Sequence, residues 1–157
     1  MNSLLFQIIF IYMSFSKIKS NDEEFRIVKL KDFTGENSYL PVKCGQKFTI
    51  EIEGNPTTGF QWSLESKSES VKDKLLTPLN LNEKNQGEFY SYNKKSEDTE
   101  LKRLGAGGIY HFKFQSDEKK SGYEELTFIH KRPWTDEGSI KQKITVKVVN
   151  LDDKKDL

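Results

Sequence analysis

This sequence has a single cysteine, Cys44, in 157 residues, so the chain cannot form an intramolecular disulfide and its fold depends on core packing. Two histidines and that cysteine are too few for a convincing zinc site, and no motif implies a cofactor. The one Asn-x-Thr match, Asn55-Pro56-Thr57, has proline in the middle position, which excludes N-glycosylation there. An excess of either charge sign is also absent, since 25 basic residues balance 24 acidic ones. This balance disfavours nucleic acid or an anionic membrane as the partner.

Catalysis would require a nucleophile beside a base, and Cys44, His111 and His130 are the candidates. Cys44 falls in a turn, His111 belongs to the outward set of its predicted strand, and His130 belongs to the inward set of another. Nothing in the pattern places them together. We therefore expect a protein that is not an enzyme.

A long apolar run is missing as well, because Leu4–Phe15 is too short to cross a bilayer as a helix. Such a run, followed by the small residues Ser16 and Ser20, is typical of a signal peptide. No Lys or Arg precedes it, and a buried N-terminal strand is the alternative. We expect residues 1–20 to be a signal peptide to the secretory or endolysosomal route. Residues 21–150 would then form one domain without a membrane segment, and residues 151–157 a disordered tail.

What the sequence does contain is alternation of apolar and polar residues with a period of two, and no long segment has a helical period. About seven short strands separated by turn-rich connections favour a β-sandwich. The polar connection 67–87 contains LLTPLNL, expected to be a loop or one helical turn, and the charged segment 93–102 is expected to be mobile. The predicted strands are Phe25–Asp32, Lys47–Glu53, Phe60–Ser66, Glu88–Tyr92, Ile109–Gln115, Tyr123–Lys131 and Ile140–Asn150.

Three connections differ from ordinary turns, and the first is NPTTG. Pro56 fixes its own φ and biases Asn55 toward extended backbone, while Gly59 can adopt a positive φ. The two threonines would therefore stand at the tip of a stiff loop. A stable turn with solvated hydroxyls is the alternative.

The second connection, LGAGGIY, precedes an aromatic-rich strand, and the third, KRPWTDEG, follows another. The glycines of the second suit either a flexible linker or close approach of a partner backbone, and a phosphate loop is excluded by their spacing. In the third, Pro133 breaks the strand, and Trp134 either inserts into a partner or caps the sandwich with Arg132 stacked on it. Loops after alternate strands emerge at one end, so the three connections should cluster.

In order and spacing these segments resemble the motifs of the chagasin family of cysteine-peptidase inhibitors: NPTTGF at Asn55–Phe60, GAGG at Gly105–Gly108 and RPWT at Arg132–Thr135. The similarity extends from about Phe25 to Asn150. It implies an all-β, immunoglobulin-like sandwich or barrel of about seven to eight strands with Greek-key connections. It also implies a reversible, tight-binding monomeric inhibitor that enters the active-site cleft of papain-like peptidases of the cathepsin L and cathepsin B types.

The resemblance assigns roles to the three segments. The threonines would lie over the catalytic cysteine and histidine of the target, the glycine segment beside its non-primed subsites, and the Arg-Pro-Trp segment on its primed side. Asp136-Glu137 and the basic pair before GAGG depart from the family's pattern, and target preference would depend on them. A non-inhibitory recognition module that uses the same loop end is the alternative function. The target-binding residues implied are Asn55, Pro56, Thr57, Thr58, Gly59, Phe60, Arg103, Leu104, Gly105, Ala106, Gly107, Gly108, Arg132, Pro133 and Trp134.

Overall fold

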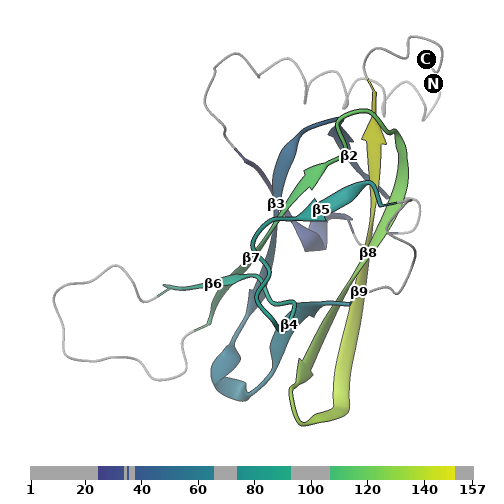
Figure 1. Ribbon diagram of the computed structural model, residues 1–157. Coiled ribbons are helices and arrows are strands. Elements are labelled where there is room, and N and C mark those ends of the chain that lie inside the picture. Colours follow the sequence, from purple (N-terminus) through teal and green to yellow (C-terminus); the bar gives the residue numbers. More distant parts are fainter. Residues whose placement is uncertain (1–24, 34, 36–37, 66–73, 93–106, 151–157) are drawn as a thin grey trace, which may run out of the picture.

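The computed structural model of the chain describes residues 25–33, 35, 38–65, 74–92 and 107–150 (Figure 1). The predicted signal peptide at 1–20, the tail at 151–157 and the charged connection at 93–102 lie outside these residues. Within the described ranges, no helix is long and apolar enough to cross a membrane.

The described chain is all-β and forms two curled sheets, which confirms the predicted immunoglobulin-like fold. Two short 3-10 turns, η1 (Leu30–Phe33) and η2 (Pro56–Thr58), are the helical elements of the described part. One sheet has the order β1 (Arg26–Lys29), β3 (Lys47–Gly54), β7 (Gly108–Ser116) and β5 (Leu76–Pro78), with β6 (Glu88–Ser91) also paired to β7. The other has the order β2 (Leu40–Lys43), β9 (Thr135–Val149), β8 (Gly122–Arg132) and β4 (Gln61–Leu64).

The apolar side chains that alternate with polar ones along the strands fill the space between the sheets, as the sequence predicts. Phe112 of β7 and Phe128 of β8 meet across the two sheets with their ring centres 4.9 Å apart. Burying each such ring contributes about 2–3 kcal/mol of transfer free energy. The core that supports the loops is therefore aromatic and close-packed. Its buried side chains include Phe48, Ile50, Ile52, Trp62, Tyr110, Phe112, Phe114, Leu126, Phe128, Ile144, Val146 and Val148.

Two strands of the structure are absent from the prediction. Leu76–Pro78, expected to be a loop or a helical turn, is β5 and pairs with β7. It lies at an edge of its sheet, where proline is tolerated because one side of the strand needs no ladder hydrogen bond. Leu40–Lys43 is β2 and pairs in parallel with β9. At three or four residues, these strands are too short for alternation to reveal them.

Strand boundaries also differ from the prediction. β9 begins at Thr135 and not at Ile140, so it spans 15 residues. The first predicted strand ends at Lys29, where the chain turns into η1 with Leu30 buried. The β9 correction matters for function, because it converts the connection after β8 into a tight hairpin.

Candidate functional site

The connection between β3 and β4 is a single 3-10 turn held by the side chain of Asn55. Asn55 caps the turn in extended backbone geometry (φ −134°, ψ 94°), and its Oδ1 accepts hydrogen bonds from the N–H (3.1 Å) and the hydroxyl (2.6 Å) of Thr57. The carbonyl oxygen of Asn55 accepts from the Thr58 hydroxyl at 2.7 Å. The loop is therefore fixed by its own polar groups, while both threonines remain exposed to solvent.

Gly59 ends this turn in the left-handed region, with φ at 84°. A side chain there would be strained, and a Cβ would also lie 3.1 Å from the indole of Trp134. Gly59 therefore reverses the chain and at the same time lets the Trp134 ring approach the loop. This contact joins the first predicted segment to the third.

The third segment is the tip of the β8–β9 hairpin. Arg132 pairs with Thr135, so Pro133 and Trp134 alone form the turn. The Trp134 side chain is 73% exposed. The Arg132 guanidinium lies 4.4 Å from the ring centre of Phe60, and thus the cation stacks on the phenylalanine that follows the first loop. The sequence offered Trp134 as a stacking partner for Arg132 and gave no sign of Phe60, because the partner depends on how two sheet ends meet.

The glycine segment is only partly described, since Arg103, Leu104, Gly105 and Ala106 lie outside the described residues. Gly108 is buried and pairs with Gly54 of β3 and with Ser91 of β6. A Cβ on Gly108 would overlap the Tyr90 carbonyl oxygen and lie 2.5 Å from the Phe89 ring. Its bare backbone is therefore required by the close approach of the protein's own β6, which local sequence pattern does not reveal.

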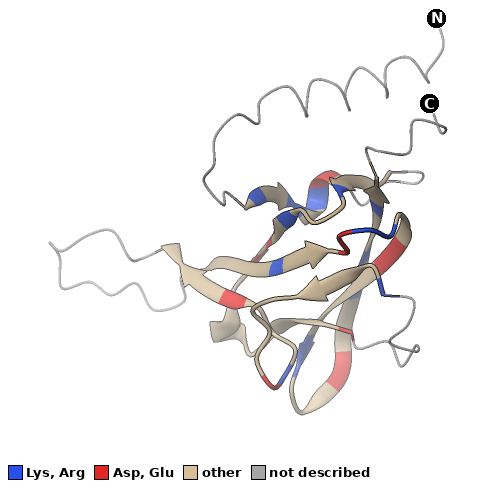
Figure 2. Cartoon of the chain, turned by 45° about the horizontal axis from the view of Figure 1, so that its top comes forward, with Lys and Arg blue, Asp and Glu red and all other residues tan. Residues whose placement is uncertain are grey.

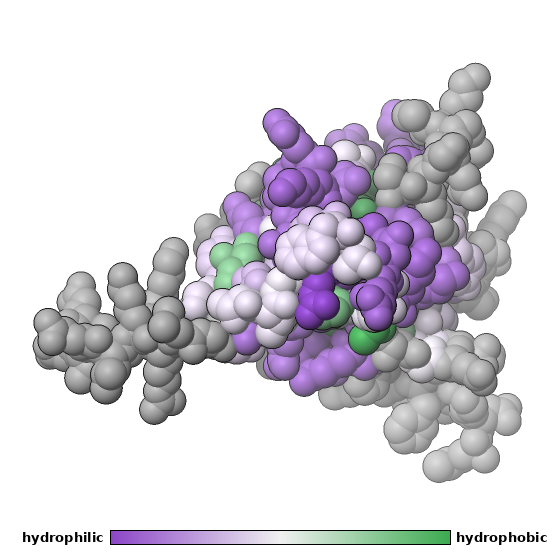
Figure 3. Space-filling model, turned by 90° about the horizontal axis from the view of Figure 1, so that it is seen from below, coloured by the Kyte–Doolittle hydropathy of each residue, from purple (hydrophilic) through white to green (hydrophobic). Residues whose placement is uncertain are grey.

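The described parts of the three segments lie at one end of the sandwich, as predicted. A Cβ on Gly107 would lie 3.3 Å from the Gly54 carbonyl oxygen and 4.0 Å from Cβ of Asn55, while Gly59 contacts Trp134 on the other side. The β3–β4 turn and the β8–β9 hairpin lie side by side at the bottom of Figure 1. Seen from below, this end is mostly pale or purple with small, separate green areas (Figure 3). The described residues of this end are therefore of polar and mixed character, and the apolar areas among them are small (Figure 3).

One ion pair neutralises part of the charge near this end. Lys131 forms an ion pair with Asp136 (2.8 Å), whose hydrogen bond lowers the pKa of the Asp136 carboxyl. Over the rest of the molecule, basic and acidic residues are interspersed (Figure 2). This end therefore offers charges of both signs together with a few polar groups.

The structure does not bring the candidate nucleophile and bases together. The N–H of Cys44 donates to the carbonyl of Val149 at the far end of β9, whereas His130 pairs with Ile140 of the same strand. Nine steps along one strand separate these partners by roughly 30 Å. Nor do the described residues contain a group of three His, Cys, Asp or Glu side chains that could hold a metal ion.

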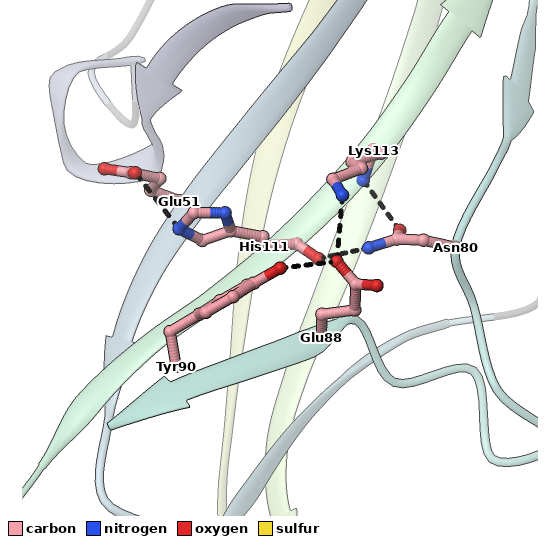
Figure 4. A network of polar contacts seen from close by, with 6 residues as sticks. All are labelled: Glu51, Asn80, Glu88, Tyr90, His111 and Lys113. Atoms are coloured by element: carbon pink, nitrogen blue, oxygen red, sulfur yellow. Dashed lines mark hydrogen bonds and ion pairs between the residues drawn. The ribbon is translucent and has the colours of Figure 1, made fainter. Parts of the chain in front are cut away.

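His111 belongs to a separate polar network on the outer face of β7 (Figure 4). Its Nε2 lies 3.2 Å from a carboxylate oxygen of Glu51, and its ring packs against Tyr90. In the same network Glu88 accepts from Lys113 at 2.9 Å, which lowers the pKa of Glu88 and raises that of Lys113. These side chains tie β6 and β3 to β7, so the network has a structural explanation.

Known proteins resemble this chain in sequence and in fold. Residues 41–148 match the family described as Chagasin family peptidase inhibitor I42, a range that includes all three segments. The chain is 31% identical to chagasin of Trypanosoma cruzi over 108 residues, which cover 68% of this chain and 84% of that protein.

Solved structures resemble this one at lower identity. The solution structure of amebosin aligns with a TM-score of 0.53 at 20% identity, covering 80% of this chain and 99% of that one. The crystal structure of the cysteine protease inhibitor EhICP2 from Entamoeba histolytica aligns with a TM-score of 0.47 at 17% identity, covering 80% and 94%. The first of these supports the fold alone. On the evidence of the family match and of the relative from Trypanosoma cruzi, the chain belongs to the chagasin family of peptidase inhibitors.

Proposed function

We propose that this chain is a reversible, tight-binding inhibitor of papain-like cysteine peptidases, and that it acts by placing its three loop segments in the active-site cleft. The observation that carries the proposal is the Asn55-held turn, which presents Thr57 and Thr58 between the glycine segment and Trp134. Membership of a peptidase-inhibitor family supports inhibition, and the resemblance of the three segments supports cysteine peptidases as the class.

The turn has the properties of an inhibitor and not of a substrate. The carbonyl of Asn55 accepts hydrogen bonds from the N–H and the hydroxyl of Thr58, and the carbonyl of Pro56 accepts from the N–H of Gly59. A peptidase cuts a bond whose carbonyl oxygen enters its oxyanion hole. Carbonyls already engaged in a 3-10 turn do not reach that position without unfolding the loop, so the loop fills the cleft without being cleaved.

Affinity would come from side chains that are already ordered in the free protein as well as from direct contacts with the target. Each side chain that is already fixed before binding saves about 0.5–1.5 kcal/mol of ordering free energy. Thr57, Thr58 and Arg132 are held by hydrogen bonds or stacking in the free protein. Trp134 adds an exposed aromatic ring of the kind that dominates binding hot spots.

The finer parts of the proposal concern partners and compartment. We infer targets of the cathepsin L and cathepsin B types, a monomeric inhibitor, and a secretory or endolysosomal location that rests on residues 1–20. N-terminal sequencing of the native protein tests the location. A mature chain that still begins at Met1 would contradict the proposed location.

The inhibition itself is tested by titrating active papain with the purified domain. Hydrolysis should fall linearly to zero near one inhibitor per active site, and activity should return on dilution. Unchanged hydrolysis at micromolar protein would instead favour a recognition module that uses the same loops. An inhibitor that is itself cut within Asn55–Phe60 would contradict the proposed role of the turn.

A further inference from the structure

His130 lies directly beneath the candidate site, between two aromatic rings. Its imidazole stacks on Trp62 with ring centres 4.6 Å apart and packs against Phe60 in a tilted arrangement with ring centres 5.2 Å apart. The Nε2 atom is buried and makes no hydrogen bond. A buried polar atom without a partner is unfavourable and is usually avoided, so a histidine here needs an explanation.

The stack extends in both directions. Toward the loop end, the Arg132 guanidinium lies over the Phe60 ring, 4.4 Å from its centre. On the inner side, the Trp62 indole donates a hydrogen bond to the Glu53 carbonyl at 3.0 Å, which anchors it to β3. The column thus runs from one sheet to the surface of the loop end, and His130 is its central ring. Displacing that ring would release Phe60 and Arg132 together.

We propose that His130 is a positioning residue of the inhibitor, and that its neutral imidazole fixes Phe60 and, through Phe60, Arg132 in the geometry a target meets. This inference rests on the proposed function and adds a form of regulation to it. Protonation of His130 would disturb the column, so inhibition should weaken in acid.

The surroundings of the imidazole favour its neutral form. Opposite it on β9, strand parity directs Gly138, Ile140 and Gln142 to its face, and none of these carries a charge. Tyr110 of β7 lies near Trp62, and burial raises the pKa of its phenol, so it stays neutral. The charged group of the column is the guanidinium of Arg132, which would repel an imidazolium. Burial also lowers the pKa of His130.

The test uses three variants, two at His130 and one at the chain's other histidine, which serves as a control. His130→Phe keeps a stacking ring without a titrating group, and His130→Ala removes the ring. His111→Phe changes the histidine on the outer face of β7, which lies outside the column. The inhibition constant for papain is measured for all four proteins at pH 7.5 and pH 5.0, at equal ionic strength.

At pH 7.5 we expect His130→Ala to inhibit about tenfold more weakly than the wild type, and His130→Phe to stay within about threefold of it, as for loss and retention of one packed ring. Between pH 7.5 and pH 5.0 inhibition by the wild type and by His111→Phe should weaken in parallel, when each inhibition constant is expressed as a ratio to that of His130→Phe. The titration of papain itself is common to all four proteins and cancels in this ratio. An inhibition constant of His130→Ala equal to that of the wild type at pH 7.5 would overturn the proposal. So would equal pH profiles for the wild type and His130→Phe.

A second measurement on the free inhibitor separates this inference from the proposed function. The Trp134 indole and Arg132 Nε signals in 1H–15N spectra should move in His130→Ala and stay in place in His130→Phe. If the wild type does not inhibit papain but the signals behave as expected, the proposed function fails and the positioning role stands. Unmoved signals in a folded His130→Ala would overturn the positioning role. If His130→Ala does not fold, the pH profile of His130→Phe decides.

Discussion

Asn55 holds Thr57 through a single atom, because Oδ1 accepts both the backbone N–H and the side-chain hydroxyl of that residue. The same device recurs at the opposite end of the sandwich, where Oδ1 of Asp117 accepts the N–H groups of Lys119 and Lys120 at 2.9 and 2.8 Å. The two turns are similar in local chemistry and differ in position. They therefore form a matched pair for separating the stability of a turn from its role in binding.

Asn55→Ala should weaken papain inhibition, because it frees the turn that presents the threonines. Loss of such a cap costs about 0.5–2 kcal/mol, which corresponds to about 2–30-fold in the inhibition constant if the turn must reorder on binding. Asp117→Ala should lower thermal stability to a similar degree and leave the inhibition constant unchanged. Equal inhibition by the wild type and Asn55→Ala would show that the turn is ordered without its cap.

Trp134→Ala should reduce affinity without reducing stability. The ring is 73% exposed, so its removal leaves the core intact, while an aromatic hot spot contributes about 1–4 kcal/mol to binding. Tyr123→Ala is the control, since that ring is 61% exposed near the other end of β8. Inhibition constants and melting temperatures of both variants decide the matter. A loss of affinity shared by both would point to a general effect on the fold.

The double variant Thr57→Ala, Thr58→Ala should also weaken inhibition by about 1–4 kcal/mol. Part of this loss comes from the target contact and part from the turn, because both hydroxyls donate hydrogen bonds to Asn55. Comparing it with Asn55→Ala in a double-mutant cycle separates the two parts. Unchanged inhibition by the double variant would place the contact surface elsewhere.

The sequence predicted those parts of the molecule that depend on local pattern. Alternation identified the buried faces, and the Pro56 and Gly59 positions identified a stiff turn with a left-handed end, which the structure confirms. It could not predict β5, because three residues with a proline carry no period and the strand exists only by pairing with β7.

Contacts between distant segments were likewise beyond local pattern. Arg132 and Phe60 are far apart in sequence and meet because β4 pairs with β8. His130 could be placed on the inward face by parity, yet parity alone does not say which rings enclose it. The site is thus recognisable from its three motifs, while the packing that supports it depends on tertiary register.

Gly108→Ala should destabilise the domain, because its Cβ would overlap the Tyr90 carbonyl and the Phe89 ring. Overpacking of this kind costs about 1–3 kcal/mol, or about 2–12 °C in melting temperature for a domain of this size. Gly107→Ala is milder, since its Cβ would lie 3.3 Å from the Gly54 carbonyl oxygen. Thermal unfolding monitored by circular dichroism compares the two. Equal stability of both variants would contradict the close approach of β6 to β7.

Stability should decrease in acid through His130, and its direction follows from linkage. Burial lowers the pKa of His130 in the folded protein below the value of about 6.5 that it has in the unfolded chain. Above that pH both states are neutral at this residue. As the pH falls through about 6.5 toward the folded-state pKa, the unfolded chain binds the proton first, and the free energy of unfolding decreases. Urea unfolding at a series of pH values should therefore show a steeper acid loss for the wild type than for His130→Phe. All other titratable groups are common to both proteins and cancel in the difference, so parallel curves for the two would mean that His130 is not held neutral by the fold.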